Sequence, residues 1–330
     1  MKARITRRGL LGVAAASLWA GPPVAWAQNA TRSWPSRPVT MIMPFAAGGG
    51  TDLLARALAQ DLSETLGQQF IVDNRTGAGG NIGAAAVAKA TPDGYTILFG
   101  TPGPLANNKL IYKNLPFDPE TAFAPIVLVA RSPLIIAAKT SLAVKDIGEL
   151  TAYAKANPGK LTVGFPGNGT LGHITSLLLQ RELGISMTNV PYRGTSEVVK
   201  DLLGDQIDLA MDFLPSYLPL AREGKIRALA VTTAERSSDL PDVQTVKEAG
   251  FRTFEASAWY ALAAPAGVPA EILGKLNAAT NAFLKSAKGQ EVLATMSLQG
   301  IGGSEADLKA FIASELRKWG PVVKEANISM

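Results

Sequence analysis

The 330-residue sequence contains no cysteine and a single histidine, and 18% of its residues are charged. The absence of cysteine excludes disulfide bonds, thiolate metal sites and cysteine nucleophiles. One histidine and few charges make the chain a poor candidate for acid–base catalysis, and we expect no metal and no cofactor. Beyond the N-terminus no run reaches the ~20 apolar residues of a membrane span. The nearest, residues 127–138, is interrupted by Arg131 and Pro133.

Positive charge is scattered along the chain instead of forming blocks. The formal net charge is +5, and without the four basic residues near the N-terminus it is about +1. A nucleic-acid interface needs a clustered basic face with stacking aromatic residues. We therefore expect no nucleic-acid partner.

The N-terminus has the three parts of a secretory leader. An apolar stretch, 9–20, precedes the small-x-small site Ala25-Trp26-Ala27, and the basic region before them comprises Lys2, Arg4, Arg7 and Arg8. We expect residues 1–27 to be a signal peptide, cleaved near Ala27, and the mature chain to be periplasmic. The Arg7-Arg8 pair also fits a twin-arginine signal, so both export routes stay open.

Two stretches share the order strand, glycine-rich turn, helix. The apolar run 39–43 leads into the turn 44–52 (PFAAGGGTD) and a helical pattern with leucine at every fourth position. The run 161–165 leads into the turn 166–173 (PGNGTLGH) and a second helical pattern. Such turns expose backbone N–H groups at the positive end of a helix dipole. Two of them in one exported chain predict two jaws that close on a small anion.

Strands and helices alternate along the whole chain, which is typical of α/β folds with parallel sheets. Roughly 300 mature residues favour two lobes. The strands are expected at 39–43, 70–72, 95–99, 161–165, 187–190, 207–211 and 228–232, and the helices at 54–66, 83–89, 173–183, 196–203, 272–284 and 306–319.

Two extended apolar stretches, 126–138 and 257–265, are candidates for paired crossover strands that form a hinge. On this interpretation residues 28–130 plus 257–330 form lobe 1, and residues 131–256 form lobe 2. Trp259 and Tyr260 in the second stretch are either core residues or one wall of the pocket.

A series of motifs in order resembles one family, the periplasmic solute-binding proteins of tripartite tricarboxylate transporters (Bug receptors, TctC-like). The resemblance covers residues 34–328. Its carriers are WPSRPV (34–39), PFAAGGGTD (44–52), DNRTGAGG (73–80), PDGYT (92–96), VPYRG (190–194), KIRALAVT (225–232), LPDV (240–243), EAG (248–250) and APAG (264–267). The chain departs from the family at Phe165, where relatives more often have serine, and it carries a second acidic residue, Asp212, beside Asp208.

The resemblance implies an α/β, two-lobed, Venus-flytrap fold of the periplasmic-binding-protein type. It also implies capture of a small carboxylate in the interlobe cleft, delivery to membrane permease subunits, and no catalysis. We expect a monomer. A ligand-responsive role, in which the closed form docks on a sensor kinase, is an alternative that the sequence does not separate from transport.

Ligands of open parallel sheets lie beyond the carboxyl ends of the strands, where the glycine turns are expected. There the backbone can approach a carboxylate, and Thr51 and Thr170 can add hydroxyl donors. The predicted ligand-binding residues are Phe45, Ala47, Gly48, Gly49, Thr51, Asp52, Phe165, Gly167, Asn168, Gly169, Thr170, His173, Arg193, Gly194, Thr195, Asp208 and Phe213.

Each chemically distinctive residue also has a structural interpretation. Asp52 fits the first turn of a helix, and His173 fits a packed or capping histidine. Arg193 fits a solvated side chain as well as a carboxylate contact, and Asp208 fits a buried structural acid. The glycines 48–50 fit a tight turn without a ligand.

Selectivity is expected to lie outside the glycine turns. The candidates are Phe165, Arg193, Asp212, Phe213 and Trp259. An aromatic ring at position 165 favours an apolar or aromatic acid over citrate, unless the ring points into the core. Dicarboxylates, tricarboxylates, acidic amino acids and aromatic acids all fit the turn chemistry.

The rival class is an enzyme. The chain has no nucleotide-binding G-x-G-x-x-G, no P-loop, no H-E-x-x-H and no G-x-S-x-G. A hydrolase would depend on His173, whose sequence neighbours offer no oriented nucleophile.

Overall fold

The computed structural model describes residues 34–252, 254–325 and 329, so the predicted leader, residues 1–27, lies outside the described residues. Within them, the strands form one ten-stranded sheet of order β2-β1-β3-β9-β4-β7-β5-β6, with β10 and β8 also pairing with β4. The strands are β1 Val39–Met43, β2 Phe70–Asn74, β3 Thr96–Gly100, β4 Phe123–Lys139, β5 Thr162–Phe165, β6 Thr188–Pro191, β7 Leu209–Phe213, β8 Ile226–Val231, β9 Ser257–Pro265 and β10 Gln299–Gly302.

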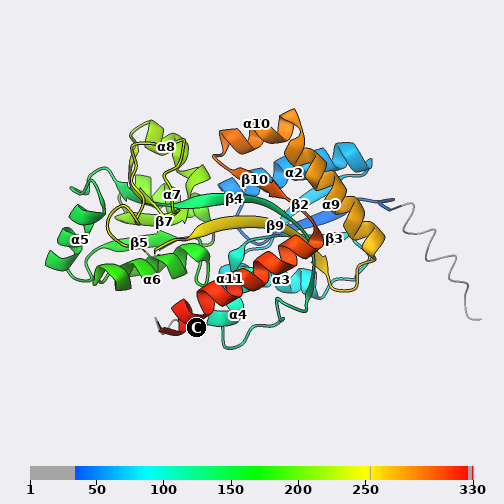
Figure 1. Ribbon diagram of the computed structural model, residues 1–330, viewed down its shortest axis with the longest axis horizontal. Coiled ribbons are helices and arrows are strands. Elements are labelled where there is room, and N and C mark those ends of the chain that lie inside the picture. Colours follow the sequence, from blue (N-terminus) through cyan, green and yellow to red (C-terminus); the bar gives the residue numbers. More distant parts are fainter. Residues whose placement is uncertain (1–33, 253, 326–328, 330) are drawn as a thin grey trace, which may run out of the picture.

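Helices alternate with the strands and pack on the sheet, as predicted for an α/β fold (Figure 1). The α-helices are α2 Gly50–Leu66, α3 Asn81–Ala88, α4 Asn108–Ile111, α5 Ile147–Ala156, α6 Leu171–Leu183, α7 Thr195–Leu203, α8 Leu218–Arg222, α9 Ala270–Lys285, α10 Ala287–Thr295 and α11 Glu305–Glu325. Three short helical turns are η1 Ala78–Gly80, η2 Gly103–Asn107 and η3 Leu214–Ser216.

Helix α2 illustrates why these elements form. Leu54, Leu58 and Leu62 recur on one face and are fully buried, as their spacing predicts. The helix ends at Gly67, whose left-handed φ of 74° lets its N–H donate to the carbonyl of Ser63. The buried leucine stripe fixes how α2 lies on the sheet, and hence where its N-terminus points.

Strand β4 joins two parallel sheets. β1 pairs in parallel with β2 and β3, and β5 pairs in parallel with β6 and β7. β4 is antiparallel to β9 as far as Pro133 and to β7 from Leu134 onward. We call residues 34–133 with 257–325 the first lobe, and residues 134–252 with 254–256 the second.

β4 and β9 run side by side between the lobes (Figure 1). The predicted pairing of the stretches 126–138 and 257–265 is therefore confirmed for residues 126–133, whereas residues 134–138 pair with β7 and β8. Whether the lobes move as units with the predicted limits, 130/131 and 256/257, stays a prediction.

Trp259 on β9 belongs to the core. Its side chain is fully buried, its indole N–H donates to Glu315 on α11 at 3.2 Å, and its ring contacts Phe311 edge-on at 5.3 Å. Tyr260 is also fully buried and stacks on Phe99. Both residues are therefore core residues, which is one of the two interpretations that the sequence allowed. The structure corrects the expectation that Trp259 selects the ligand.

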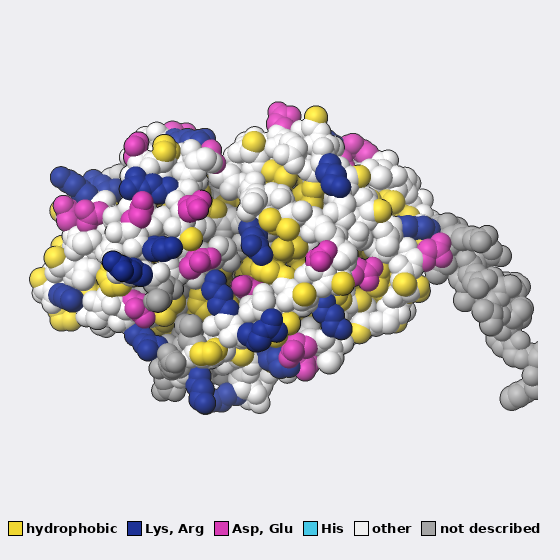
Figure 2. All heavy atoms as spheres, in the orientation of Figure 1, with side chains coloured by type: hydrophobic (Ala, Val, Ile, Leu, Met, Phe, Trp, Pro, Cys, Tyr) yellow, Lys and Arg dark blue, Asp and Glu magenta, His cyan; other side chains and the backbone are white. Residues whose placement is uncertain are grey.

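Some element boundaries differ from the expectation. The strand expected at 207–211 is β7, Leu209–Phe213, two residues further along. No pattern in the sequence predicted the helices α4, α5, α8 and α10 or the strand β10. Among the described residues no helix combines the length and the apolarity needed to cross a membrane. On the face in Figure 2, Lys and Arg side chains are interspersed with Asp and Glu, in keeping with the scattered charges of the sequence.

Thr232 ties together the two crossover strands at the second lobe. Its hydroxyl accepts a hydrogen bond from the N–H of Leu134 on β4 at 3.2 Å and donates to the carbonyl of Ala256, just before β9, at 2.7 Å. The side chain is fully buried.

Thr232→Val keeps the side-chain shape and removes both hydrogen bonds. We expect the free energy of unfolding to fall by about 1–3 kcal/mol, because buried polar groups of Leu134 and Ala256 lose a partner. Urea unfolding measures this. Thr233→Val is the matched control, because its hydroxyl only bonds the nearby carbonyl of Glu235 at the surface; equal losses in both variants would contradict the role of Thr232.

Candidate functional site between the lobes

The two predicted glycine turns face the opposite lobe across the cleft. The turn after β1 belongs to the first lobe and the turn after β5 to the second. The N–H of Gly50 donates to Ser216 Oγ at 2.7 Å, and Ser196 Oγ donates to the carbonyl of Ala47 at 3.3 Å. Both hydrogen bonds join one lobe to the other, so the structure has the lobes in contact.

A third glycine turn, 77–80, completes this contact. A Cβ placed on Gly79 would lie 2.0 Å from the carbonyl oxygen of Asn168, so the backbones of the two lobes nearly touch there. The hydroxyl of Tyr112 donates to the same carbonyl at 2.6 Å. Gly79 has a positive φ of 61°, which glycine adopts without strain. This turn follows β2, just as the other two follow β1 and β5.

Between the lobes lies an outer cavity of about 510 Å³. Its charged lining residues are Arg193 and Glu197. In the described part of the chain the guanidinium of Arg193 has no ion-pair partner, whereas Glu197 accepts a hydrogen bond from the backbone N–H of Arg193 at 3.0 Å. The lining consists of Phe45, Gly77, Ala78, Gly79, Gly80, Tyr112, Pro166, Gly167, Asn168, Pro191, Tyr192, Arg193 and Glu197.

An inner cavity of about 20 Å³ shares Phe45 and Pro166 with the outer one. That volume holds a group the size of one or two water molecules. Two acidic residues, Asp52 and Asp212, border it. The lining consists of Met43, Phe45, Ala46, Gly49, Thr51, Asp52, Thr101, Pro166, Thr170, Leu171, Thr195, Asp212 and Phe213.

Asp52 holds the first glycine turn in place. Its carboxylate accepts the N–H of Gly48 at 3.0 Å, Nε of Arg56 at 2.9 Å and the amide of Asn74 at 2.9 Å. Burial raises the pKa of Asp52, but these hydrogen bonds outweigh burial and keep its pKa below the usual value. Asp52 is therefore an ionised acid whose charge Arg56 balances.

His173 is packed within the second lobe. Its Nδ1 accepts the N–H of Gly169 at 3.2 Å, and its ring lies 4.7 Å from that of Phe165. Burial lowers the pKa of His173 to about 4, so the imidazole is neutral near pH 7. It lines neither cavity, so the structure favours its packing role over a ligand contact.

Phe165 is a core residue in this structure. It is fully buried, packs against His173 with the two rings tilted by 37°, and lines neither cavity. Val163 and Phe165 lie on the same face of β5, since side chains alternate along a strand, and both are buried. The structure corrects the prediction that Phe165 contacts and selects the ligand.

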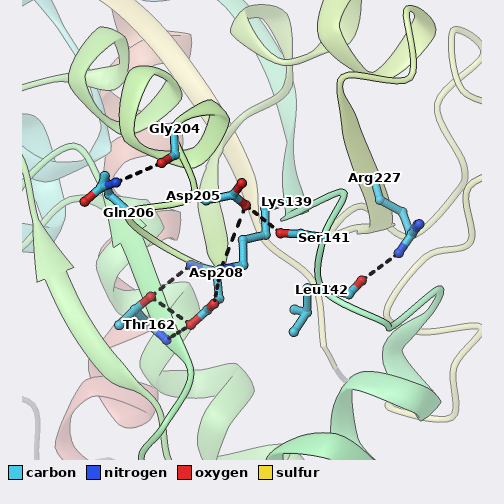
Figure 3. A network of polar contacts seen from close by, with 9 residues as sticks. All are labelled: Lys139, Ser141, Leu142, Thr162, Gly204, Asp205, Gln206, Asp208 and Arg227. Atoms are coloured by element: carbon cyan, nitrogen blue, oxygen red, sulfur yellow. Dashed lines mark hydrogen bonds and ion pairs between the residues drawn. The ribbon is translucent and has the colours of Figure 1, made fainter.

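Asp208 lies at the wrong end of the sheet for a ligand contact. It comes just before β7, where it accepts hydrogen bonds from the N–H of Thr162 at 2.8 Å and pairs with Lys139 at 2.9 Å (Figure 3). Burial raises the pKa of Asp208, but Lys139 and Thr162 outweigh it and lower the pKa. Thr162 starts β5, whereas the cleft lies beyond the end of β5. Asp208 is a structural acid, and its prediction as a ligand residue is corrected.

Thr170 also differs from the expectation. Its hydroxyl donates to the carbonyl of Gly167 at 2.7 Å and accepts the N–H of His173 at 3.4 Å, so it caps α6. The donor of Thr170 is therefore engaged, and Thr51 is the remaining candidate hydroxyl in the two turns.

The structure brings most predicted residues to one place. Those that line a cavity are Phe45, Gly49, Thr51, Asp52, Gly167, Asn168, Thr170, Arg193, Thr195 and Phe213. Those that line neither are Ala47, Gly48, Phe165, Gly169, His173, Gly194 and Asp208.

Several lining residues were missed as ligand contacts. The turn 77–80 carried a recognisable signal, because it is glycine-rich and follows a strand as the other two turns do. Tyr112, Tyr192 and Glu197 carried no such signal. Tyr112 reaches the cleft from a short helix far away in sequence, which only the fold reveals.

A side chain at Gly49 should hold the lobes apart. Gly49 is extended, with φ −82°, so its need for glycine is steric: an added Cβ would lie 3.1 Å from Cβ of Thr195 in the other lobe. We expect Gly49→Val to weaken ligand binding roughly 10- to 100-fold through overpacking of the interlobe contact. Calorimetry measures the affinity, and small-angle scattering shows whether the lobes separate.

Gly169→Val should weaken binding as well, since its Cβ would lie 2.5 Å from the Tyr112 ring and its φ of 82° would strain a valine. Gly274→Val on α9 is the control, because its Cβ would meet no atom within 4 Å. Unchanged affinity in both cleft variants, with an unchanged circular dichroism spectrum, would show that these turns need glycine for some other reason.

Known proteins match the chain over most of its length. The model of the tripartite tricarboxylate transporter family receptor matches residues 54–328. The protein BugT of Bordetella pertussis is 34% identical over 299 residues, which cover 90% of this chain and 92% of BugT.

Two solved structures from Rhodopseudomonas palustris share the fold. Rpa4515 with adipate is 40% identical with a TM-score of 0.87, over 90% of this chain and 100% of the other. MatC with bound malate is 33% identical with a TM-score of 0.85, over 88% of this chain and 100% of the other. The chain therefore belongs to the tripartite tricarboxylate transporter receptor family and has the two-lobed α/β fold of periplasmic solute-binding proteins.

Proposed function

We propose that this protein captures a small carboxylate between its lobes in the periplasm and delivers it to the membrane subunits of a tripartite tricarboxylate-type transporter. The observation that carries the proposal is a cavity bracketed by glycine turns from both lobes, at the carboxyl ends of parallel strands. Supporting it, the relatives Rpa4515 and MatC have adipate and malate bound.

The backbone supplies the anion site. Among the first N–H groups of α2 and α6, that of Gly50 donates to Ser216 and that of His173 to the hydroxyl of Thr170. The remaining first-turn N–H groups have no partner within their helices, and the helix dipoles favour negative charge at these ends. Charge-assisted N–H···O⁻ bonds are roughly twice as strong as neutral ones. A carboxylate can therefore be bound with few cationic side chains.

Arg193 supplies a cation at the outer end. Its guanidinium borders the 510 Å³ cavity and has no ion-pair partner among the described residues. A dicarboxylate would place one carboxylate near the glycine turns and the other near Arg193. This favours a dicarboxylate over the aromatic monocarboxylate that Phe165 had indicated, since Phe165 is buried in the core.

The lobes would close on the ligand by bending along β4 and β9, with residues 28–130 plus 257–330 and residues 131–256 as the moving units. We propose that the mature protein is a monomer, exported by the leader 1–27, and that the closed form is what the permease subunits recognise. Docking on a sensor kinase is the alternative partner. Deletion of the permease genes would distinguish transport from signalling, because it abolishes uptake of the ligand only if the protein serves a transporter.

Catalysis has little support in the geometry. His173 is neutral and its Nδ1 is engaged by Gly169. In the described part of the chain no serine or threonine hydroxyl donates to its ring. We propose that the ligand is released unchanged.

A carboxylate panel tests the function. A ligand that binds the folded form raises the melting temperature with concentration, so adipate, malate, citrate, glutamate and benzoate should separate by the size of this shift. Recovery of unchanged ligand by mass spectrometry tests the absence of turnover. If none of these acids shifts the melting temperature, the carboxylate proposal is wrong.

Arg193→Gln should weaken dicarboxylate binding about tenfold and leave monocarboxylate binding nearly unchanged, because one exposed charge-assisted contact is lost. Isothermal titration with adipate and with hexanoate measures both. Lys200→Gln on α7 is the control, an exposed cation that lines neither cavity. An equal loss in both variants would point to a general charge effect.

A further inference from the structure

Asp212 is a buried acid at the carboxyl end of β7. It is fully buried and borders the inner cavity between the two glycine turns. β7 runs parallel to β5, with Gly164 opposite Ala210, so Asp212 lies level with the start of the second glycine turn. It therefore faces the place where the proposed function puts a ligand carboxylate.

The groups that hold Asp212 are neutral donors. Oδ1 accepts the N–H of Phe213 at 2.7 Å, Oδ2 accepts the hydroxyl of Tyr217 at 3.2 Å, and Thr195 on α7 adds a side-chain hydrogen bond. Tyr260 on β9 is the remaining titratable neighbour, and burial keeps its pKa and that of Tyr217 above the usual value.

No cation balances Asp212 within the described residues. Asp52, the other acid at the inner cavity, has Arg56 as its partner. Burial raises the pKa of Asp212 to about 7, and the hydrogen bonds from Phe213, Thr195 and Tyr217 only partly offset it. The group is therefore divided between its charged and neutral forms near neutral pH.

A ligand carboxylate in the inner cavity would place a second negative charge beside this acid. A like charge within about 4–6 Å disfavours the ionised form, and this holds whether the ligand touches Asp212 or a water lies between them. Resting on the proposed function, we propose that Asp212 takes up one proton from solvent when a carboxylate binds, and gives it back when the ligand leaves.

This coupling also gives selectivity. Neutral Asp212 can donate a hydrogen bond toward a carboxylate. A ligand that presents an ammonium group, such as an amino acid, favours ionised Asp212 and binds without proton uptake. Asp212 thus distinguishes carboxylates from ligands with an ammonium group, because the affinity for the first falls as the pH rises and the affinity for the second does not.

Titration calorimetry with adipate, and with malate as a second probe, tests the proposal. In buffers of different ionisation enthalpy at pH 8, binding should take up close to one proton per ligand. Between pH 7.5 and 9 the Kd should rise about tenfold per pH unit, because free Asp212 is mostly ionised there and must be protonated first.

Asp212→Asn mimics the neutral acid. Its Kd should be nearly constant across this range and lower than that of the parent protein at pH 9, whereas a merely structural role would weaken binding at every pH. Asp208→Asn, four residues earlier and outside the cleft, should keep the parent pH dependence. Melting temperatures show whether each variant is folded.

A parent Kd that is independent of pH, or a pH dependence that Asp212→Asn retains, would overturn the proposal while leaving carboxylate capture intact. Proton release on binding would overturn it as well. If neither probe binds, the acid of the carboxylate panel that does bind takes their place in these titrations. Failure of every acid of the panel to bind at any pH would instead overturn the proposed function, and this inference with it.

Discussion

At the contact between the lobes, the two backbones approach more closely than side chains would allow. Gly79 meets Asn168 and Gly194 meets Ala46, where an added Cβ would lie 2.0 Å and 2.8 Å from its neighbours. The site depends on this approach, because it places backbone groups of both lobes around one small space. Helix N-termini can act on a shared anion only when no side chain separates them. Glycine is thus required in these turns because the opposite lobe leaves no room for a side chain, as well as because of the conformation of the turn itself.

Much of the fold could be predicted from the spacing of apolar residues and from the glycine-rich turns between the elements. Leucine spacing marked α2, and glycine-rich turns marked the ends of β1, β2 and β5. The site was predicted less completely than the fold. Which way a side chain points depends on the alternation of side chains along a strand and on the direction in which the strand runs. Alternation with Val163 places Phe165 in the core, and the parallel direction of β7 brings Asp212, not Asp208, to the cleft. Tyr112 depends on packing between distant segments, which local patterns do not encode.

The cleft proposed to bind an anion carries little positive charge. Arg56 is committed to Asp52 at 2.9 Å, and Arg193 borders only the outer cavity. The inner end offers backbone N–H groups, hydroxyls and one acid without a cation. In such a low-dielectric space every unbalanced charge interacts strongly. The protonation of Asp212 and the charge of the ligand therefore have to be considered together.

The glycine contacts also limit how firmly the lobes are held together. Backbone approach at Gly79 and Gly194 itself buries little apolar surface, whereas nearby Phe213 of the second lobe packs edge-on against Tyr260 of the first, with ring centroids 5.6 Å apart. The interlobe hydrogen bonds Gly50–Ser216, Ser196–Ala47 and Tyr112–Asn168 each contribute only about 0.5–1.5 kcal/mol. A ligand bound to both lobes adds interactions that the separated lobes lack, and this difference sets how far it shifts the equilibrium. On the proposed function, the contacts that the ligand makes with both lobes therefore decide how far the closed arrangement is favoured.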